Sequence, residues 1–259
     1  MKEKENNKSL SGRKFLVDTL PKILYKVNIS KINQEKINEI RNTLDENQNL
    51  NFIIYLNHVT YFDPLYAGHI INKFDPEGKR HIVAPISFSH TQSKTKDSTL
   101  KMMMGLAEVC KLETVRIIQA YQVNNPKYGY TQEQANITYK KFFNRSKELK
   151  NENIPTGMII FPEGTRSQNG ELGEAEKGIT LLAKILEPVL LIPVGICFDN
   201  EYKRSGLNLG KSLNLEIGET YLYEKGKDKK DIDFYMNKLA ETLPEKMRGK
   251  WAQMPEIRK

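Results

Sequence analysis

The segment NHVTYFDP holds the first pair of side chains suited to chemistry, His58 and Asp63. A histidine takes a proton from a hydroxyl near neutral pH, and a carboxylate on its other ring nitrogen fixes the tautomer and stabilises the imidazolium. On one regular helix the two side chains would point about 140° apart, because each residue turns roughly 100°. The pair therefore needs a loop to bring it together. The alternative is that Asp63 only caps a helix and His58 is an ordinary turn residue.

A second group of side chains lies in FPEGTRS, residues 161–167. Gly164 permits a tight backbone turn, and Arg166 presents a planar fork that suits phosphate or carboxylate. Glu163 is able to orient that guanidinium or to accept a hydrogen bond from a substrate hydroxyl. The alternative for this segment is a surface turn that carries a salt bridge.

Each group follows an apolar run that predicts a buried strand, FIIYL at 52–56 and GMIIF at 157–161. Functional groups of α/β proteins gather where such strands end. Asp63 and Pro64 predict that a helix starts after the first strand, with Asp as N-cap and Pro at the first helical position. The two groups are thus expected at one edge of a sheet.

Strands alternate with helices along the rest of the chain, which indicates an α/β fold, a single domain with a mixed central sheet covered by helices. Thr131 and Gln134 form a capping box that opens a helix through Leu149. Further strands are expected at 81–86, 115–123, 189–196 and 213–217, and further helices around Ile37, Ile40 and Leu44, over 177–186 and near 232–243. Residues 75–105 are less regular, and we expect a mobile segment there that covers the substrate.

The composition is that of a folded protein with an anionic partner. Of 259 residues, 39% are hydrophobic and 28% charged, so a disordered or fibrous chain is excluded. The net charge of +8 favours nucleic acid, a membrane surface or a phosphorylated substrate. Cys110 and Cys197 stand alone, which excludes a cysteine-rich zinc module or a disulfide scaffold and favours the cytoplasm.

The charge pattern divides the chain into three expected parts: an N-terminal helical arm at 1–49, a core at 50–224, and a linker with a C-terminal helix at 225–259. Within the arm, residues 19–27 place apolar side chains at helical spacing beside lysines, so we expect a basic amphipathic helix that faces a membrane. The alternative is that this stripe packs on the core. The most apolar run, 189–198, is about half the length needed to span a bilayer. No signal peptide is expected, because Asp18 interrupts the apolar run at the N-terminus.

The two motifs together resemble the glycerolipid acyltransferase superfamily typified by 1-acyl-sn-glycerol-3-phosphate acyltransferases. The first block of that family is N-H-x-x-x-x-D, found here from Asn57 to Asp63, and its third is F-P-E-G-T-R-S, found unchanged at 161–167. Lys177 with Gly178 and the apolar run at 191–194 are similar to later features of the family. The resemblance covers roughly residues 50–220.

The resemblance implies transfer of an acyl group from a thioester, acyl-CoA or acyl carrier protein, to a hydroxyl of a phosphorylated glycerol-type acceptor such as lysophosphatidic acid. It implies no cofactor, no metal and no covalent enzyme intermediate. His58 would be the general base and Asp63 its orienting partner. The acceptor would be bound by residues of the third block: Glu163, Gly164, Thr165 and Arg166.

Several alternatives remain open in the sequence. The second block of the family has an arginine just after a strand, whereas Arg116 here lies inside the expected strand. The acceptor is therefore open among lysophosphatidic acid, glycerol 3-phosphate, a lyso-aminolipid and an alcohol. A catalytically silent lipid-binding relative is a further alternative. The expected partners are the acyl donor, the acceptor and a membrane surface. The protein is expected in the cytoplasm, bound peripherally to the inner face of a membrane.

The basic residues, the other histidines and the methionines give weaker indications of function. No basic stripe alternates with aromatic residues, so no nucleic-acid partner is expected. His69, His81 and His90 lack metal-ligand spacing to any cysteine or acidic pair, and we expect no metal site. The methionines at 102–104 suit either core packing or contact with an acyl chain.

Overall fold

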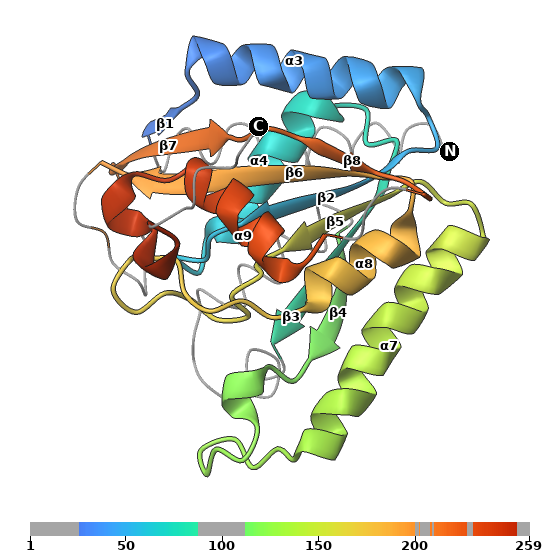
Figure 1. Cartoon of the computed structure of the whole chain (residues 1–259), viewed down its shortest axis with the longest axis vertical. Coiled ribbons are helices and arrows are strands. Elements are labelled where there is room, and N and C mark those ends of the chain that lie inside the picture. Colours follow the sequence, from blue (N-terminus) through green and yellow to red (C-terminus); the bar gives the residue numbers. More distant parts are fainter. Residues whose placement is uncertain are drawn as a thin grey trace, which may run out of the picture.

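The computed structural model describes residues 26–87, 112–199, 202, 208, 210–226 and 230–252. In this part of the chain the strands form one mixed sheet of eight strands, in the order β1-β7-β6-β2-β5-β3-β4, with β8 paired to β6 (Figure 1). The strands are β1 (Lys26–Asn28), β2 (Asn51–Leu56), β3 (His81–Ser87), β4 (Glu113–Ile117), β5 (Thr156–Ile160), β6 (Val189–Phe198), β7 (Ser212–Ile217) and β8 (Tyr221–Tyr223).

Five neighbouring strands, from β6 to the edge strand β4, run parallel and form the larger part of the sheet. Every residue of β2, β5 and β6 is buried, so both faces of the sheet are covered there. Strands buried on both faces have near-continuous apolar sequences, as these do. β7 and β8 run antiparallel to β6, which makes the sheet mixed as the sequence predicts.

Helices cover the two faces of the sheet. Figure 1 shows α4 behind the sheet, and α8 and α9 in front of it. α3 contacts α4, and α7 contacts α8. Short 3-10 turns follow β4 and α9. The helical elements are α3 (Lys31–Glu46), α4 (Asp63–Phe74), η2 (Ala120–Gln122), α7 (Gln132–Asn151), α8 (Gly178–Leu186), α9 (Ile232–Glu241), η3 (Glu245–Met247) and η4 (Gly249–Ala252).

The connections of the parallel strands place the switch point of the sheet between β2 and β5. From β2 the chain passes through α4 towards β3 on one side, and from β5 it passes through α8 towards β6 on the other side. Because crossover connections are right-handed, helices that travel in opposite directions lie on opposite faces of the sheet. Between two such strands the loops diverge, and ligands of open α/β sheets bind at this switch point.

The register of β2 against β5 aligns the two motifs. Tyr55 pairs with Ile160 near the ends of the two strands. Three residues beyond these partners stand His58 and Glu163, one in each motif. The register therefore brings the two sequence blocks together at the carboxyl edge of the sheet, as expected from the sequence.

The described parts of the predicted arm and C-terminal segment lie against the sheet. β1 pairs with β7, and the predicted helix around Ile37, Ile40 and Leu44 is α3, whose apolar side joins the core. The predicted basic helix at 19–27 is wrong at its end, because Lys26–Asn28 is a strand; residues 19–25 lie outside the described part. α9 packs on β6, and its predicted range is confirmed to within two residues.

The strand predicted at 115–123 is shorter than expected. β4 ends at Ile117, and the chain then turns through η2. The Gln122 side chain accepts a hydrogen bond from the Gln119 backbone N–H, at 2.9 Å, and this local bond competes with an extended strand. By contrast, the capping box of Thr131 and Gln134 is confirmed at the start of α7. Of residues 75–105, expected to hold a mobile segment that covers the substrate, His81–Ser87 form β3, and residues 88–105 lie outside the described part of the chain.

Candidate active site

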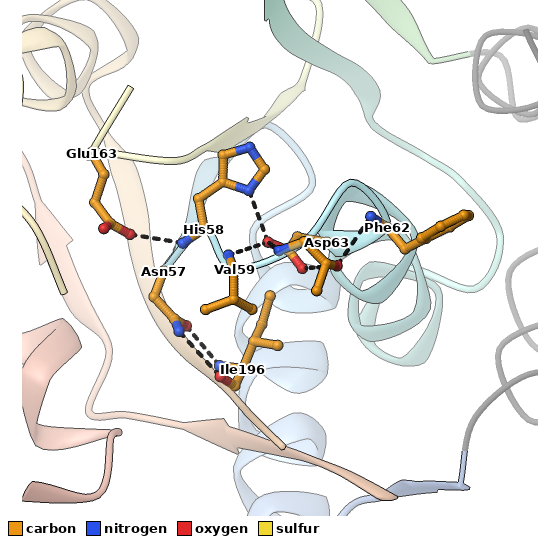
Figure 2. Close-up of polar contacts among 8 residues, drawn as sticks. Asn57, His58, Val59, Phe62, Asp63, Glu163 and Ile196 are labelled. Atoms are coloured by element: carbon orange, nitrogen blue, oxygen red, sulfur yellow. Dashed lines mark hydrogen bonds and ion pairs between the residues drawn. The ribbon is translucent and has the colours of Figure 1, made fainter. Parts of the chain in front are cut away.

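His58 and Asp63 form a hydrogen-bonded pair at the end of β2 (Figure 2). The distance from His58 Nδ1 to Asp63 Oδ2 is 2.8 Å. His58 lies in the loop after β2, and Asp63 is the first residue of α4. The loop thus brings together two side chains that a continuous helix would separate, as the spacing predicts.

Asp63 is fully buried, and backbone and side-chain donors surround its carboxylate. Besides His58 Nδ1, Oδ2 accepts from the backbone N–H groups of Val59 at 2.6 Å and Thr60 at 2.8 Å. Oδ1 accepts from the Thr60 hydroxyl at 2.7 Å. These bonds fix the carboxylate beside the His58 ring, where it is suited to orient the ring and to stabilise an imidazolium. The expectation that Asp63 is the N-cap is wrong by one residue: the N-cap is Phe62, and the carboxylate bonds to the loop before it.

The ring of His58 is held between this pair and an aromatic face. It stacks on Phe161, with 4.3 Å between ring centroids and 26° between ring planes. The His58 side chain is 18% exposed, whereas the Asp63 side chain is 0% exposed. The aspartate is therefore sealed in the interior, while the histidine keeps access to a substrate.

The third block holds the main chain of His58 from both sides. The His58 N–H donates to Glu163 Oε1 at 2.7 Å, and the His58 carbonyl accepts from the Ser167 N–H at 2.7 Å. The second oxygen of Glu163 accepts from the Gly173 N–H at 2.9 Å. Burial raises the pKa of Glu163 to about 7, although its two backbone hydrogen bonds act in the opposite direction and Asp63 raises it further. The loop after β5 is thus hydrogen-bonded directly to the main chain of His58.

Asn57 fixes the chain just before the histidine. Its side-chain amide donates to the Ile196 carbonyl at 3.1 Å and accepts from the Ile196 N–H at 2.7 Å (Figure 2). Asn57 is 2% exposed, and its amide forms the same pair of hydrogen bonds with the Ile196 backbone that a neighbouring strand would form. The backbone that carries His58 is therefore tied to β6 on one side and to the loop after β5 on the other.

The predicted turn in the third block is present. Gly164 has φ of +63°, a left-handed conformation that favours glycine, and its N–H donates to the Phe161 carbonyl at 3.0 Å. Thr165 is exposed. The guanidinium of Arg166 lies 3.6 Å from the centroid of the Tyr61 ring. Glu163 bonds to the backbone N–H groups of His58 and Gly173, and Arg166 stacks on Tyr61 of the first motif.

Three residues that contact the site were not predicted from the sequence: Thr60, Tyr61 and Gly173. Thr60 stands three residues before Asp63, a spacing typical of local side-chain to backbone turns, which is the signal that would have indicated it. Tyr61 is an unassigned position of the first motif, and no pattern pointed to its stacking. Gly173 lies in an irregular segment ten residues after Glu163, and no local signal links the two.

The other histidines stand elsewhere in the fold. His69 is buried within α4, and His81 contacts Glu113 at 2.5 Å on neighbouring strands. His90 and the methionines at 102–104 lie outside the described residues. Within the described ranges, no helix combines the length and apolar character that crossing a membrane requires.

Comparison with known proteins identifies the family. The model of the Acyltransferase family matches residues 28–197, well over half of the chain, and the chain belongs to this family. One similar solved structure is the 1-acyl-sn-glycerophosphate (LPA) acyltransferase PlsC from Thermotoga maritima, with 15% identity and a TM-score of 0.39 over 91% of this chain and 94% of that chain. The comparison with curated proteins found no match.

Proposed function

We propose that this acyltransferase moves a fatty acyl group from an acyl thioester to a hydroxyl of a phosphorylated acceptor similar to lysophosphatidic acid, with His58 as the general base. The observation that carries the proposal is the 2.8 Å contact between His58 and a fully buried Asp63 at the switch point of the sheet. Membership of the Acyltransferase family supports acyl transfer as the reaction. Acyl-CoA or acyl carrier protein is the proposed donor.

The proposed proton path follows from which ring nitrogen is occupied. If Nδ1–H donates to Asp63, Nε2 carries the free lone pair and removes the proton of the acceptor hydroxyl. The hydroxyl oxygen then bonds to the thioester carbonyl carbon, and the resulting tetrahedral intermediate breaks its C–S bond. The imidazolium returns the proton to the leaving thiolate. His58 ends as it began, and the products are an ester and a free thiol.

Arg166 is proposed to bind the phosphate of the acceptor. A guanidinium offers parallel N–H donors that match phosphate oxygens. Stacking on Tyr61 at 3.6 Å orients the plane of this guanidinium beside the His58 loop. Gly164 allows the backbone to turn closely there, and the exposed Thr165 supplies a further polar group.

A different acceptor with the same chemistry is the second candidate. Arg116 is exposed within β4 and does not follow a strand end, unlike the arginine of the family's second block. Arg116 is the penultimate residue of β4, so the second block departs from the family pattern by position. Glycerol 3-phosphate, a lyso-aminolipid or an uncharged alcohol belongs in the same assay as lysophosphatidic acid.

One assay tests the proposal. Purified protein is incubated with radiolabelled acyl-CoA, or with acylated carrier protein, and with the panel of acceptors, and the products are separated by thin-layer chromatography. We expect an acylated phosphorylated acceptor, and a turnover roughly 10² to 10⁴ times lower for His58→Ala, the usual loss when a general base is removed. A His58→Ala variant with the wild-type rate would exclude His58 as the base. A folded protein that acylates no acceptor would support the silent lipid-binding relative.

A further inference from the structure

The geometry points to Glu163 as a positioning residue that holds the main chain of His58, and not as a contact for the acceptor. This inference rests on the proposed function, because it assigns Glu163 a role in keeping the general base in place. Both carboxylate oxygens of Glu163 already accept backbone hydrogen bonds, Oε1 from His58 and Oε2 from Gly173. Figure 2 shows the carboxylate directed at the His58 N–H group, on the side opposite Asp63.

Burial separates Glu163 from the acceptor. Glu163 is 7% exposed, whereas Thr165, two residues on in the same turn, is exposed. A bound hydroxyl would have to enter the interior to reach this carboxylate, whose two oxygens already accept the backbone N–H groups of His58 and Gly173. An unpaired buried N–H is costly, so exchange of these bonds for a substrate contact is unfavourable.

The backbone at His58 is bonded at both of its polar groups to the loop after β5. Its N–H donates to Glu163 and its carbonyl accepts from Ser167, both at 2.7 Å. Asp63 holds only the ring, through Nδ1. The position of the reactive Nε2 is therefore set from two directions, by Asp63 through the ring and by the third block through the main chain.

Loss of the Glu163 contact should move the base without removing it. Glutamine retains one acceptor oxygen, but its NH₂ group would face one of the two backbone N–H donors and leave that donor unpaired. A displacement of about 1 Å in a reacting group costs on the order of 10²-fold in rate. Because the acceptor does not touch Glu163 in this account, its binding should be unaffected.

The kinetic test compares Glu163→Gln with Glu176→Gln, which changes an exposed carboxylate beside Gly164. With lysophosphatidic acid and acyl-CoA, we expect kcat of Glu163→Gln to fall about 10²-fold while the acceptor KM stays within about twofold of wild type. Glu176→Gln should match wild type in both. A raised acceptor KM with an unchanged kcat would overturn the inference and return Glu163 to the acceptor site.

A second variant tests the same contact if Glu163→Gln fails to fold. A Cβ at Gly173 would stand 3.2 Å from Glu163 Oε2, close enough to displace the carboxylate by a few tenths of an ångström. Gly173→Ala leaves the Glu163 side chain intact and, in this account, touches no substrate. We expect a smaller loss of kcat, again with the acceptor KM unchanged; an increase in the acceptor KM alone would contradict the inference.

A measurement without substrate separates this inference from the proposed function. In protein labelled with ¹⁵N-histidine, the ring signals of His58 are identified by their absence in His58→Ala. Wild type should show a single tautomer with the proton on Nδ1, and Glu163→Gln a mixture of tautomers, because a displaced ring meets Asp63 less well. An unchanged tautomer in Glu163→Gln would overturn the positioning role, even if His58→Ala is inactive. An active His58→Ala would instead remove the proposed function.

Discussion

At the scale of single residues, the site depends on the hydrogen bonds that the buried carboxylate of Asp63 accepts. Asp63 accepts hydrogen bonds from His58 Nδ1, from two backbone N–H groups and from the Thr60 hydroxyl. The side chain therefore has two tasks, orienting the histidine and closing the loop between β2 and α4. A substitution at this position should affect both.

We predict that Asp63→Asn lowers stability as well as turnover. The asparagine NH₂ group would face donors, and each buried donor left unpaired costs roughly 1 to 3 kcal/mol. Urea unfolding gives the loss in the free energy of unfolding, and single-turnover assays give the loss in rate. Thr60→Ser, which keeps the hydroxyl donor to Oδ1, is the matched control and should be close to wild type in both. Unchanged unfolding of Asp63→Asn would show that the loop does not depend on the carboxylate.

Glu163 should make stability depend on pH in an unusual direction. Burial raises its pKa from 4.5 to about 7, so between these values the folded chain binds a proton that the unfolded chain has lost. Stability conferred by the protonated carboxyl is therefore complete below pH 4.5 and is lost as pH rises towards 7. We predict that wild type loses up to roughly 3 kcal/mol relative to Glu163→Gln over this range. Urea titrations at several pH values test this, and a constant difference between the two proteins would contradict it.

Arg166 is predicted to be replaced poorly by lysine. The Arg166 guanidinium stacks on Tyr61, and an ammonium group reproduces neither this stacking nor a bidentate contact with phosphate. Arg166→Lys should raise the KM for a phosphorylated acceptor roughly tenfold or more, since charged hydrogen bonds contribute about 1.5 to 3 kcal/mol. The donor KM should not change. An equal defect towards an uncharged alcohol acceptor would count against phosphate recognition.

At the scale of elements, the contact between β2 and β5 aligns the two motifs, and it leaves no room for a side chain at Gly157. A Cβ at Gly157 would collide with the ring of Phe52 in β2 and would stand 2.7 Å from Ile82 Cδ1 in β3. Gly157 is the register partner of Phe52, which lies four residues before Leu56, the last β2 residue that pairs with β6. Because Gly157 has no side chain, the Phe52 ring packs in the space beside it.

Gly157→Ala is predicted to destabilise the fold by roughly 1 to 3 kcal/mol, the usual cost of inserting a methyl group into a packed core. Thermal and urea unfolding measure this loss. The double variant with Phe52→Leu should recover part of it, because the smaller side chain vacates the space that the new methyl group needs. Losses that simply add in the double variant would show that the Phe52 ring is not the obstacle.

At the scale of the whole molecule, the open question is how an acyltransferase reaches a lipid acceptor. We propose that the basic N-terminal segment holds the protein peripherally on an anionic membrane, the cytoplasmic face being the expected one. Lys8, Arg13, Lys14 and Lys22 precede the first described strand. Each basic residue near an anionic surface contributes about 1 kcal/mol to binding. β1 and α3 pack on the sheet, so removal of residues 1–25 leaves the described fold complete.

Deletion of residues 1–25 is predicted to abolish salt-sensitive binding to anionic liposomes while the protein stays folded. Co-sedimentation at low and high salt measures binding, and circular dichroism with thermal unfolding checks the fold. Liposomes of neutral lipid serve as the control, because attraction to anionic headgroups is the proposed cause. Undiminished binding after the deletion, or loss of the fold, would assign these residues to another role, such as packing on the core.

The sequence by itself determined the local features of this protein. Apolar runs marked β2, β5 and β6, because strands buried on both faces need apolar residues at every position. The capping box at Thr131 marked the start of α7, and the spacing of His58 and Asp63 required a loop between them. These features depend on neighbours in the chain, so the chain order is sufficient to predict them.

Only the tertiary structure decided which groups meet across the motifs. Glu163 reaches the His58 backbone because β2 and β5 are adjacent and in a register that places the two residues opposite each other. Gly173 and Tyr61 join the site through the path of irregular loops, which has no periodic signal in sequence. Strand order, register and loop path arise from packing between distant segments, and local propensity contains no information about them. From sequence, Glu163 is expected to orient Arg166 or to contact the acceptor; the structure shows it bonded to the backbone of His58, a contact that no local pattern indicates.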